Sequence, residues 1–327
     1  MKIPTVKLTP TLLKAISQLE TAIGLIAKSN IPIENIRRIE DKSILKSSLY
    51  SARIEGNALD EQTFATTNDQ TAKIEVFNLV DVTNYLKHSP LRKQITLDDI
   101  RHIHTMVMNK LTDDAGHLRN NQNAIFDQSG SVRYLPPPPI AMRKDLTMLI
   151  DYCNSPSEFP ILTSLIAHLV FEKIHPFIDG NGRVGRLLIT MIMMTQGVQF
   201  PIVVPFERYL EDNRAQYYRH IDTGLVNPSE YLLFMLEGMT YEFEIVRQEL
   251  VQVDLGHTPF LPIRQEEIYR IIIDHPYITV DGIRRRFMSV PVRTLRYDIS
   301  KLISKKLVSK IGSTKGSCYK ANTSRGE

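Results

Sequence analysis

The most informative stretch of this chain is residues 175–186, which reads HPFIDGNGRVGR. Two glycines flank Asn181 in a tight turn after Asp179, and such a turn lets successive backbone N–H groups converge on an anion. The helix predicted to begin just after the turn adds the positive end of its dipole at the same point. Arg183 and Arg186 lie three residues apart on that helix, so both guanidinium groups reach one side. Two guanidinium groups beside a nest of N–H donors are typical of a polyphosphate site.

Two further side chains of this stretch could supply chemistry. Asp179 stands at the rim of the turn, and carboxylate oxygens are hard ligands that suit Mg²⁺ between phosphates. His175 ends the preceding predicted helix and titrates near neutral pH, so it can act as a general base. His168 and Glu172 precede it on the same helix and could buttress this base, although a hydrogen-bonded core histidine is the more common role for such a residue.

Two other phosphate or metal motifs do not fit the stretch. In an EF-hand counted from Asp179, the glycine position would hold Val184 and the twelfth position Thr190. A Walker A loop would need Gly-Lys-Ser/Thr, which is missing. The remaining alternative is a helix corner with two surface arginines and a core histidine. The joint spacing of His175, Phe177 and the two arginines disfavours it.

Helical periodicity dominates the chain on both sides of this stretch. Thr9-Pro10 is a typical helix start, and apolar residues then recur at four- and three-residue steps from Leu12 to Ile26. Similar apolar stripes predict further helices at residues 100–111, 146–152, 161–174 and 231–250. The fold class that we expect for the first 250 residues is therefore all-α.

Strand signals in the first 250 residues are confined to one short region. Residues 124–126 (AIF) and 132–134 (VRY) flank residues 127–130 (DQSG), which have the composition of a hairpin turn. The prolines at residues 136–139 predict a fixed, extended exit that neither continues a strand nor begins a helix at once.

The composition describes an ordinary globular chain. It has 327 residues, 43% of them apolar, and 40 Lys+Arg against 36 Asp+Glu. This length suggests about two domains, and the composition excludes a disordered or fibrous chain.

Cys153 and Cys318 form no CxxC pair, which disfavours a disulfide scaffold or a thiolate zinc site and favours a reducing compartment. Residues 1–7 contain no apolar core of a signal peptide, and the uncharged run between Arg186 and Glu207 is too interrupted to cross a bilayer. We therefore expect a cytoplasmic location and no membrane partner.

A domain boundary is predicted at residues 254–262, where a glycine and two prolines break a long helix. From residue 263 to residue 327 the sequence holds 14 Lys+Arg against 6 Asp+Glu, a net charge of +8, while the preceding 262 residues have a net charge of −4. A mildly acidic helical body thus precedes a small basic domain.

The pattern after this boundary is helix, helix, helix, hairpin. The predicted elements are residues 268–274, residues 280–287, a helix opened by residues 289–291, and strands at residues 307–311 and 317–320. This order resembles a winged helix-turn-helix, an α+β domain, whose third helix would present Arg293, Arg296 and Tyr297. Such a domain binds DNA through backbone phosphates and a groove. A basic module that docks on protein is an equally good interpretation.

Residues 175–186 also resemble the signature of the Fic family, H-x-F-x-[DE]-G-N-G-R-x-x-R, with a match at every specified position. The resemblance extends over about residues 40–250. It implies an all-α Fic fold with a small β-hairpin flap, over about residues 121–139, that pins a target segment by strand pairing. It also implies an enzyme that moves AMP from ATP to a Ser, Thr or Tyr hydroxyl of a target protein, with self-modification expected.

The resemblance assigns roles to individual residues. His175 resembles the catalytic base and Asp179 the Mg²⁺ ligand. The ATP-binding positions that it implies are Gly180, Asn181, Gly182, Arg183, Val184, Gly185, Arg186 and Tyr217. The target-docking positions of the flap are Ile125, Phe126, Val132 and Tyr134. Tyr217 and Tyr218 stand where family members often build the adenine pocket, and two aromatic residues of the helix core are an equally good reading.

A second motif lies at residues 51–57, which read SARIEGN. Gly56 is a natural helix cap, and the helix dipole disfavours the charge of Glu55 in the last turn by about 0.3–1 kcal/mol. A charge in such a place suggests a partner elsewhere, although a solvated glutamate is the simpler alternative. The string resembles the inhibitory motif [ST]-x-x-x-E-[GN] of Fic proteins. The resemblance implies that Ser51, Glu55 and Gly56 are inhibitory and that Glu55 pairs with Arg186 and obstructs the γ-phosphate of ATP.

The sequence therefore predicts an autoinhibited protein adenylyltransferase with three segments. These are a helical and catalytic region at residues 1–253, a linker at residues 254–262 and a winged-helix-like domain at residues 263–327. The expected cofactor is Mg²⁺, and the expected partners are ATP, a target protein, and DNA or protein at the C-terminal domain, with a homodimer left open. Two different functions remain open. One is transfer of phosphate, UMP or phosphocholine, or removal of AMP, on the same fold. The second is that of a DNA-binding regulator whose body only senses nucleotide.

Overall fold

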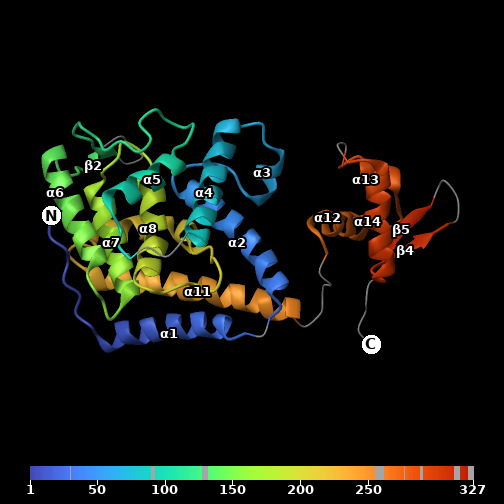
Figure 1. The fold of residues 1–327 in the computed structure, drawn as a ribbon, viewed down its shortest axis with the longest axis horizontal. Coiled ribbons are helices and arrows are strands. Elements are labelled where there is room, and N and C mark those ends of the chain that lie inside the picture. The colour runs from blue at the N-terminus through green and yellow to red at the C-terminus, as the bar shows by residue number, and fades with distance from the viewer. Residues whose placement is uncertain are drawn as a thin grey trace. The chain divides into compact units, whose positions relative to one another are not determined.

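The fold was analysed in a computed structural model, which describes residues 1–29, 31–89, 93–126, 132–254, 261–275, 277–287, 290–312 and 317–322. The chain forms two compact units, Met1–Leu255 and Gly256–Glu327 (Figure 1). Most of the predicted linker, residues 255–260, lies outside the described residues. Within the described ranges, every helix is too short or too polar to cross a membrane.

The larger unit consists of helices and one short hairpin, as the periodicity predicted. Its helices are α1 (Pro10–Ala27), α2 (Ile33–Ile54), α3 (Glu61–Thr66), α4 (Gln70–His88), α5 (Leu97–Val107), α6 (Pro139–Asn154), α7 (Pro160–Ile174), α8 (Asn181–Thr195), α9 (Glu207–Asp212), α10 (Arg214–Thr223) and α11 (Pro228–Asp254). Each apolar stripe of the sequence overlaps one of these helices. Thr9 caps α1 as expected, since its hydroxyl accepts a hydrogen bond from the Leu12 N–H at 3.2 Å. Figure 1 shows α1 lying along α11, and the two helices are in contact.

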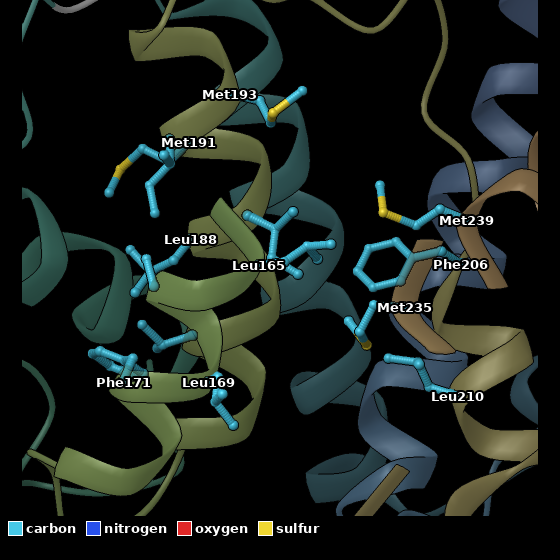
Figure 2. Close-up of a cluster of buried hydrophobic side chains, with 14 of the residues drawn as sticks. Leu165, Leu169, Phe171, Leu188, Met191, Met193, Phe206, Leu210, Met235 and Met239 are labelled. Atoms are coloured by element: carbon cyan, nitrogen blue, oxygen red, sulfur yellow. The ribbon is translucent and has the colours of Figure 1, made fainter. Parts of the chain in front are cut away.

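The core of this unit is built around α7 and α8. The α7 sequence is apolar on all sides and almost every residue in it is buried, as expected for a helix inside a domain. Figure 2 shows side chains of the two helices in one cluster with side chains of α9, α11 and the segment before α9. They include Leu165, Leu169, Phe171, Leu188, Met191, Met193, Phe206, Leu210, Met235 and Met239. Fully burying one such side chain contributes about 1.5–3 kcal/mol. The loop between α7 and α8, which carries the signature, therefore stands on a well-packed base.

The predicted hairpin consists of β1 (Ile125–Phe126) and β2 (Val132–Tyr134), which pair antiparallel. Ile125 faces Tyr134 and Phe126 faces Val132, with a register irregularity between the two pairs. The predicted turn at residues 127–130 lies outside the described residues. The prediction for the proline run was wrong at its last residue, because α6 begins at Pro139. Proline suits the first helical position, where its missing N–H has no helical partner to lose.

The smaller unit has its own core and a three-stranded antiparallel sheet in the order β3-β5-β4. Its elements are α12 (Ile263–Asp274), β3 (Ile278–Thr279), α13 (Val280–Arg284), α14 (Val292–Ser304), β4 (Val308–Ile311) and β5 (Cys318–Ala321). Ile268, Ile272, Ile283, Leu295 and Leu302 are fully buried in that core. Three details differ from the sequence prediction. The first helix begins at Ile263 instead of Ile268, and the second ends at Arg284 instead of Phe287. Strand β3 was not predicted, because two residues are too short to show alternation.

Candidate active site

The signature folds as a tight corner between α7 and α8. Helix α7 ends at His175, which adopts the left-handed conformation at φ 50° and ψ 62°. Gly180, at φ 79°, opens α8. A non-glycine residue in the left-handed region is strained and needs support from its surroundings. Arg119 supplies that support, since its Nε donates to the His175 carbonyl at 2.8 Å and its backbone N–H donates to the Pro176 carbonyl at 2.9 Å.

Buried polar side chains fix the shape of this turn. The Asn181 amide exchanges two hydrogen bonds with the backbone of Phe177, at 2.9 and 3.0 Å. The His104 ring stacks on the Phe177 ring, with centroids 3.7 Å apart. The Gly116 N–H donates to Nδ1 of His104 at 2.8 Å, so Nε2 of His104 carries the proton and donates to the Asp179 carbonyl at 3.0 Å. Asn181 therefore acts on the site by shaping the turn, and its side chain is 2% exposed.

The His175 imidazole has the properties of a neutral base. Burial lowers the pKa of His175 to about 4, because a charged ring loses hydration there. Its Nδ1 lies 3.3 Å from the Glu172 carbonyl. With the proton on Nδ1, Nε2 is the nitrogen that can accept a proton from a bound hydroxyl.

The two arginines of the signature form hydrogen bonds with different residues. Arg186 is 1% exposed, and its guanidinium donates to the Ser51 hydroxyl at 3.0 Å, the Ser51 carbonyl at 2.9 Å and the Glu55 carboxylate at 3.0 Å. Burial is the largest single influence and opposes the charge of Arg186, but the Glu55 carboxylate together with Tyr217, Glu172 and Tyr218 outweighs burial and raises the pKa of Arg186 above its ordinary value. The sequence-based pairing of Glu55 with Arg186 corresponds to a direct contact in the structure.

A glycine cap aims Glu55 at this arginine. Gly56 has φ +105°, which a residue with a side chain rarely adopts. The Gly56 N–H donates to the Arg53 carbonyl and the Asn57 N–H donates to the Ala52 carbonyl, which together form a Schellman motif that ends α2. Glu55 is the last residue before the chain turns away from the helix, so its side chain projects from the end of α2.

Gly182 leaves room for the Glu55 carboxylate. A Cβ atom added at Gly182 would lie 2.2 Å from Oε1 of Glu55. The carboxylate therefore lies against the backbone at the start of α8. That backbone carries the N–H groups that the sequence assigned to an anion.

Arg183 contacts an acid that sequence reasoning missed. Its guanidinium donates to Oε1 of Glu75 on α4 at 2.6 Å and to Oδ1 of Asp179 at 2.9 Å. The other oxygen of Glu75 accepts a hydrogen bond from the Asn57 side chain at 2.8 Å. Glu75 thus links Arg183 to the segment just after α2. Since 108 residues separate Glu75 from Arg183, no local pattern could have identified this contact.

Behind the corner lies a buried polar cluster. His168 is 0% exposed, and its Nδ1 and Nε2 lie 2.7 Å from the Tyr231 hydroxyl and 3.1 Å from the Tyr217 hydroxyl. Burial lowers the pKa of His168 to about 3 and raises the pKa of Glu172 to about 8. Tyr217 is 1% exposed and packs as a core aromatic here, so its contact with ATP stays a prediction. The Tyr218 side chain is only partly buried and donates to the Ile54 carbonyl.

Two positions between the arginines contribute through packing. The Val184 side chain is fully buried in the core. A Cβ atom on Gly185 would lie 2.4 Å from Oε1 of Glu172, so glycine allows α7 and α8 to approach closely. Their assignment to ATP binding stays a prediction.

The hairpin is fastened beside the corner by three contacts. The Tyr134 hydroxyl donates to the Lys173 carbonyl at 2.9 Å. Arg133 makes two hydrogen bonds to Asp222 on α10, at 2.6 and 2.8 Å. Arg119 donates to the Asn121 carbonyl at 3.1 Å and to the Pro137 carbonyl, so the guanidinium that supports His175 also holds both ends of the hairpin segment.

Comparison with known proteins identifies first the fold of the chain and then a domain within it. The chain has the fold of a Fic family protein from Desulfovibrio desulfuricans G20, with a TM-score of 0.65 over 99% of both chains at 21% identity. A Fic-1 fragment from Caenorhabditis elegans matches with a TM-score of 0.61 over 76% of this chain and 74% of that one, at 22% identity. Residues 94–193 match the model of the Fic/DOC family. The chain therefore contains a Fic/DOC domain at these residues.

The curated relatives have a named activity. Protein adenylyltransferase fic-1 from Caenorhabditis elegans is 33% identical over 151 residues, which cover 44% of this chain and 27% of the relative. Protein adenylyltransferase Fic from Nematostella vectensis is 30% identical over 154 residues, which cover 45% of this chain and 33% of the relative. The match thus spans about a third or less of the length of these two relatives.

Proposed function

We propose that this chain is an autoinhibited protein adenylyltransferase that moves AMP from Mg-ATP to a Ser, Thr or Tyr hydroxyl of a target protein, and also to itself. The observation that carries the proposal is a neutral His175 on a rigid corner that also presents the N–H groups of α8. The adenylyltransferase names of the curated relatives support this choice among Fic-type transfers.

The proposed chemistry is an in-line displacement at the α-phosphorus of ATP. Nε2 of His175 accepts the proton of the target hydroxyl while the hydroxyl oxygen attacks phosphorus. The new O–P bond forms as the bond to the bridging β-oxygen breaks, and pyrophosphate leaves. The N–H groups of Asn181 and Gly182 at the start of α8 would stabilise the phosphate charge, and the Gly180 N–H would join them once it releases the Asp179 carboxylate. Positioning and fixed donors supply most of the catalysis in reactions of this kind.

Asp179 is the residue that would hold the Mg²⁺ ion of Mg-ATP. Its side chain is 67% exposed, and Oδ1 already accepts hydrogen bonds from the Gly180 N–H at 2.6 Å and from Arg183. Oδ2 is thus the oxygen that suits a hard cation. Across the part of the chain that the structure describes, no three His, Cys, Asp or Glu side chains gather as a metal site. Phosphate oxygens and water would therefore complete the shell, and the bound ion would neutralise phosphate charge.

Inhibition is proposed to come from Glu55 on α2. Its carboxylate holds Arg186, together with Ser51, and lies beside Gly182. While Arg186 is held in this way, it is not available to a γ-phosphate, and the negative charge of Glu55 repels one. Ser51 and Gly56 support this arrangement, because one binds the arginine and the other turns the helix end.

The hairpin is the proposed target-docking flap. Val132 is 58% exposed and offers an apolar contact, whereas the Tyr134 hydroxyl fastens β2 to α7. Ile125 and Phe126 of β1 complete the proposed docking set. Backbone pairing with a target segment would set its register without requiring one particular side chain.

We propose that residues 1–253 are the catalytic region and that residues 263–327 form a winged-helix-like domain. A second function, duplex DNA binding, is supported by the net charge of +8 in the smaller unit and by Tyr297 on α14, which is 58% exposed. DNA binding through phosphates weakens steeply with salt, so a salt-dependent mobility shift tests it. The low number of cysteines, Cys153 and Cys318, supports the proposal of a cytoplasmic location.

Labelled nucleotides test the main proposal. The purified chain is incubated with Mg²⁺ and ATP labelled on the α-phosphate or on the γ-phosphate. AMP transfer puts only the α-label on protein, and mass spectrometry then identifies AMP on a hydroxyl. The His175→Ala variant should bind ATP and transfer nothing, because the base acts on the hydroxyl. Label from the γ-phosphate alone would instead establish phosphate transfer. Label from UTP would establish UMP transfer, and label from CDP-choline would establish phosphocholine transfer.

A further inference from the structure

A pocket lies beside α8, and its lining shares Arg186 with the proposed catalytic site. Its cavity volume is about 210 Å³. Its walls come from α2, α4, α8, α11 and residues 199–207. Within the described residues, its lining includes neither His175 nor the turn at residues 177–182.

One wall is an apolar surface on α8. Leu187, Thr190 and Met194 recur along one side of the helix and are partly exposed, while their neighbours Leu188 and Ile189 are buried. Residues with i, i+3 and i+7 spacing share a helix face. The facing wall is also apolar, and its members are Phe200, Ile202, Val204, Phe206, Met239 and Phe243. The pocket therefore suits a hydrocarbon group.

Glu207 gives this apolar pocket a buried carboxyl group that can carry a negative charge. The Glu207 residue is 5% exposed, and its carboxylate accepts a hydrogen bond from the Ser47 hydroxyl at 2.8 Å. Among the described residues, no Lys, Arg or His side chain forms an ion pair with it at 4 Å or less. Burial raises the pKa of Glu207 to about 7. A buried carboxylate is costly unless it is paired, so a cation that entered the pocket would gain a partner.

The other charges of the lining are already paired. Lys87 forms an ion pair with Glu40, and Arg186 is held by Glu55 and Ser51. An anionic ligand would therefore meet the unpaired Glu207 carboxylate without a free cation beside it. A cationic ligand would instead find the Glu207 carboxylate as a partner and no unpaired cation to repel it.

We propose that this pocket is a binding site for a small organic amine, with its ammonium group on Glu207 and its apolar chain along Leu187, Thr190 and Met194. An ammonium group has three donors, and Glu207 with neighbouring carbonyl or hydroxyl oxygens can accept them. The proposal does not depend on the reaction at His175. It assigns a second ligand site to the helix that carries both arginines, farther along α8 from the turn at residues 177–182.

The test is a titration of the full chain with n-hexylamine by isothermal calorimetry. Hexan-1-ol is the neutral probe of the same shape. We expect saturable binding of hexylamine at one site and binding of hexanol at least tenfold weaker. Absence of saturable hexylamine binding, or equal affinity for the two probes, would overturn the proposal.

Variants locate the site. Glu207→Gln keeps the size and the Ser47 hydrogen bond, and it should weaken hexylamine at least tenfold while hexanol is unchanged. Glu244→Gln removes a carboxylate that pairs with Arg247 on α11, outside the pocket lining, and should bind hexylamine like the natural chain. Thr190→Phe fills the pocket and should abolish binding of both probes, which keeps the test decisive if Glu207→Gln does not fold. Unchanged hexylamine affinity in either pocket variant, with the fold intact, would place the amine elsewhere.

Discussion

At the scale of single residues, Arg119 organises the backbone around the proposed base. This side chain is almost completely buried, although arginine usually lies at the surface. Its guanidinium donates to the carbonyl groups of His175, Ile174, Asn121 and Pro137. One residue thereby connects the end of α7 with both ends of the hairpin segment. Since its partners are all main-chain atoms, no side-chain motif identifies it.

We therefore predict that Arg119→Ala is strongly destabilising. Several carbonyl groups would lose a charge-assisted donor, and each such bond is worth about 1.5–3 kcal/mol. The bonds share one side chain and are not additive, so the free energy of unfolding should fall by about 2–4 kcal/mol. Urea denaturation measures it. Arg119→Lys, which keeps the charge but not the planar fork, should recover only part of the loss. Full stability in the alanine variant would contradict this role.

The depressed pKa of His175 predicts how transfer depends on pH. A histidine with its ordinary pKa of about 6.5 is about nine-tenths protonated at pH 5.5 and would lose about tenfold in rate as a base. His175, with a pKa of about 4, stays mostly neutral at pH 5.5. The Glu55 carboxylate raises this pKa, so removing it lowers the pKa further. Single-turnover transfer by Glu55→Gly should therefore be nearly constant between pH 5.5 and 8. A tenfold loss at pH 5.5 would contradict the neutral-base assignment.

The lowered pKa of His175 also makes the free energy of unfolding depend on pH. Between pH 4 and 6.5 the unfolded histidine binds a proton that the folded His175 does not. The contribution of His175 to the free energy of unfolding therefore rises with pH across that window.

At the scale of elements, α2 and α8 are joined by one buried arginine. Ser51 and Glu55 lie four residues apart on α2, and both contact Arg186 on α8. Residues with this spacing share a helix face. A small movement of the end of α2 would remove the carboxylate from the arginine and from Gly182 together. The contact thus has the form of a switch between two helices.

We predict that Glu55→Gly activates transfer by about tenfold to a hundredfold. A charge-assisted hydrogen bond is worth about 1.5–3 kcal/mol, and about 1.4 kcal/mol corresponds to tenfold in rate. The freed Arg186 would then bind the γ-phosphate and align the α-phosphorus. Self-modification at saturating Mg-ATP measures the effect. Glu55→Gln, which keeps the size without the charge, should activate less, and Arg186→Ala should cancel the gain. Equal rates for Glu55→Gly and the natural chain would make Glu55 an ordinary surface residue.

The sequence was most predictive where residues near one another in the chain act together. The spacing within residues 175–186 predicted the turn and the start of α8, and the motif at residues 51–57 predicted the helix cap. The pairing of Glu55 with Arg186 came from family resemblance. Glu75 and His104 were missed because they reach the site from other helices. For Tyr217 the sequence left an adenine pocket and the helix core as equal alternatives, because it does not specify how the helices pack. In the structure Tyr217 is buried beside His168.

At the scale of the whole molecule, the change in composition coincides with a division into two cores. The larger unit carries every residue of the proposed reaction, and the smaller unit has a separate core. The sequence predicted that the second domain begins at Ile263. However, Leu261 is 4% exposed and belongs to the second core. A cut at Pro262 would remove this side chain from the smaller unit and expose it on the larger one.

We therefore predict that the chain can be divided after Asp254 without loss of transfer. Residues 1–254 should retain self-modification within about twofold of the full chain, because their core and all proposed catalytic groups remain. Residues 256–327 should fold alone, and a cooperative thermal transition measured by circular dichroism checks this. The same fragment beginning at Ile263 is the matched control and should melt lower, since fully burying a leucine contributes about 1.5–3 kcal/mol. Complete loss of transfer in a folded 1–254 fragment would mean that the basic unit takes part in catalysis. Equal melting temperatures for the two short fragments would mean that Leu261 is not part of the second core.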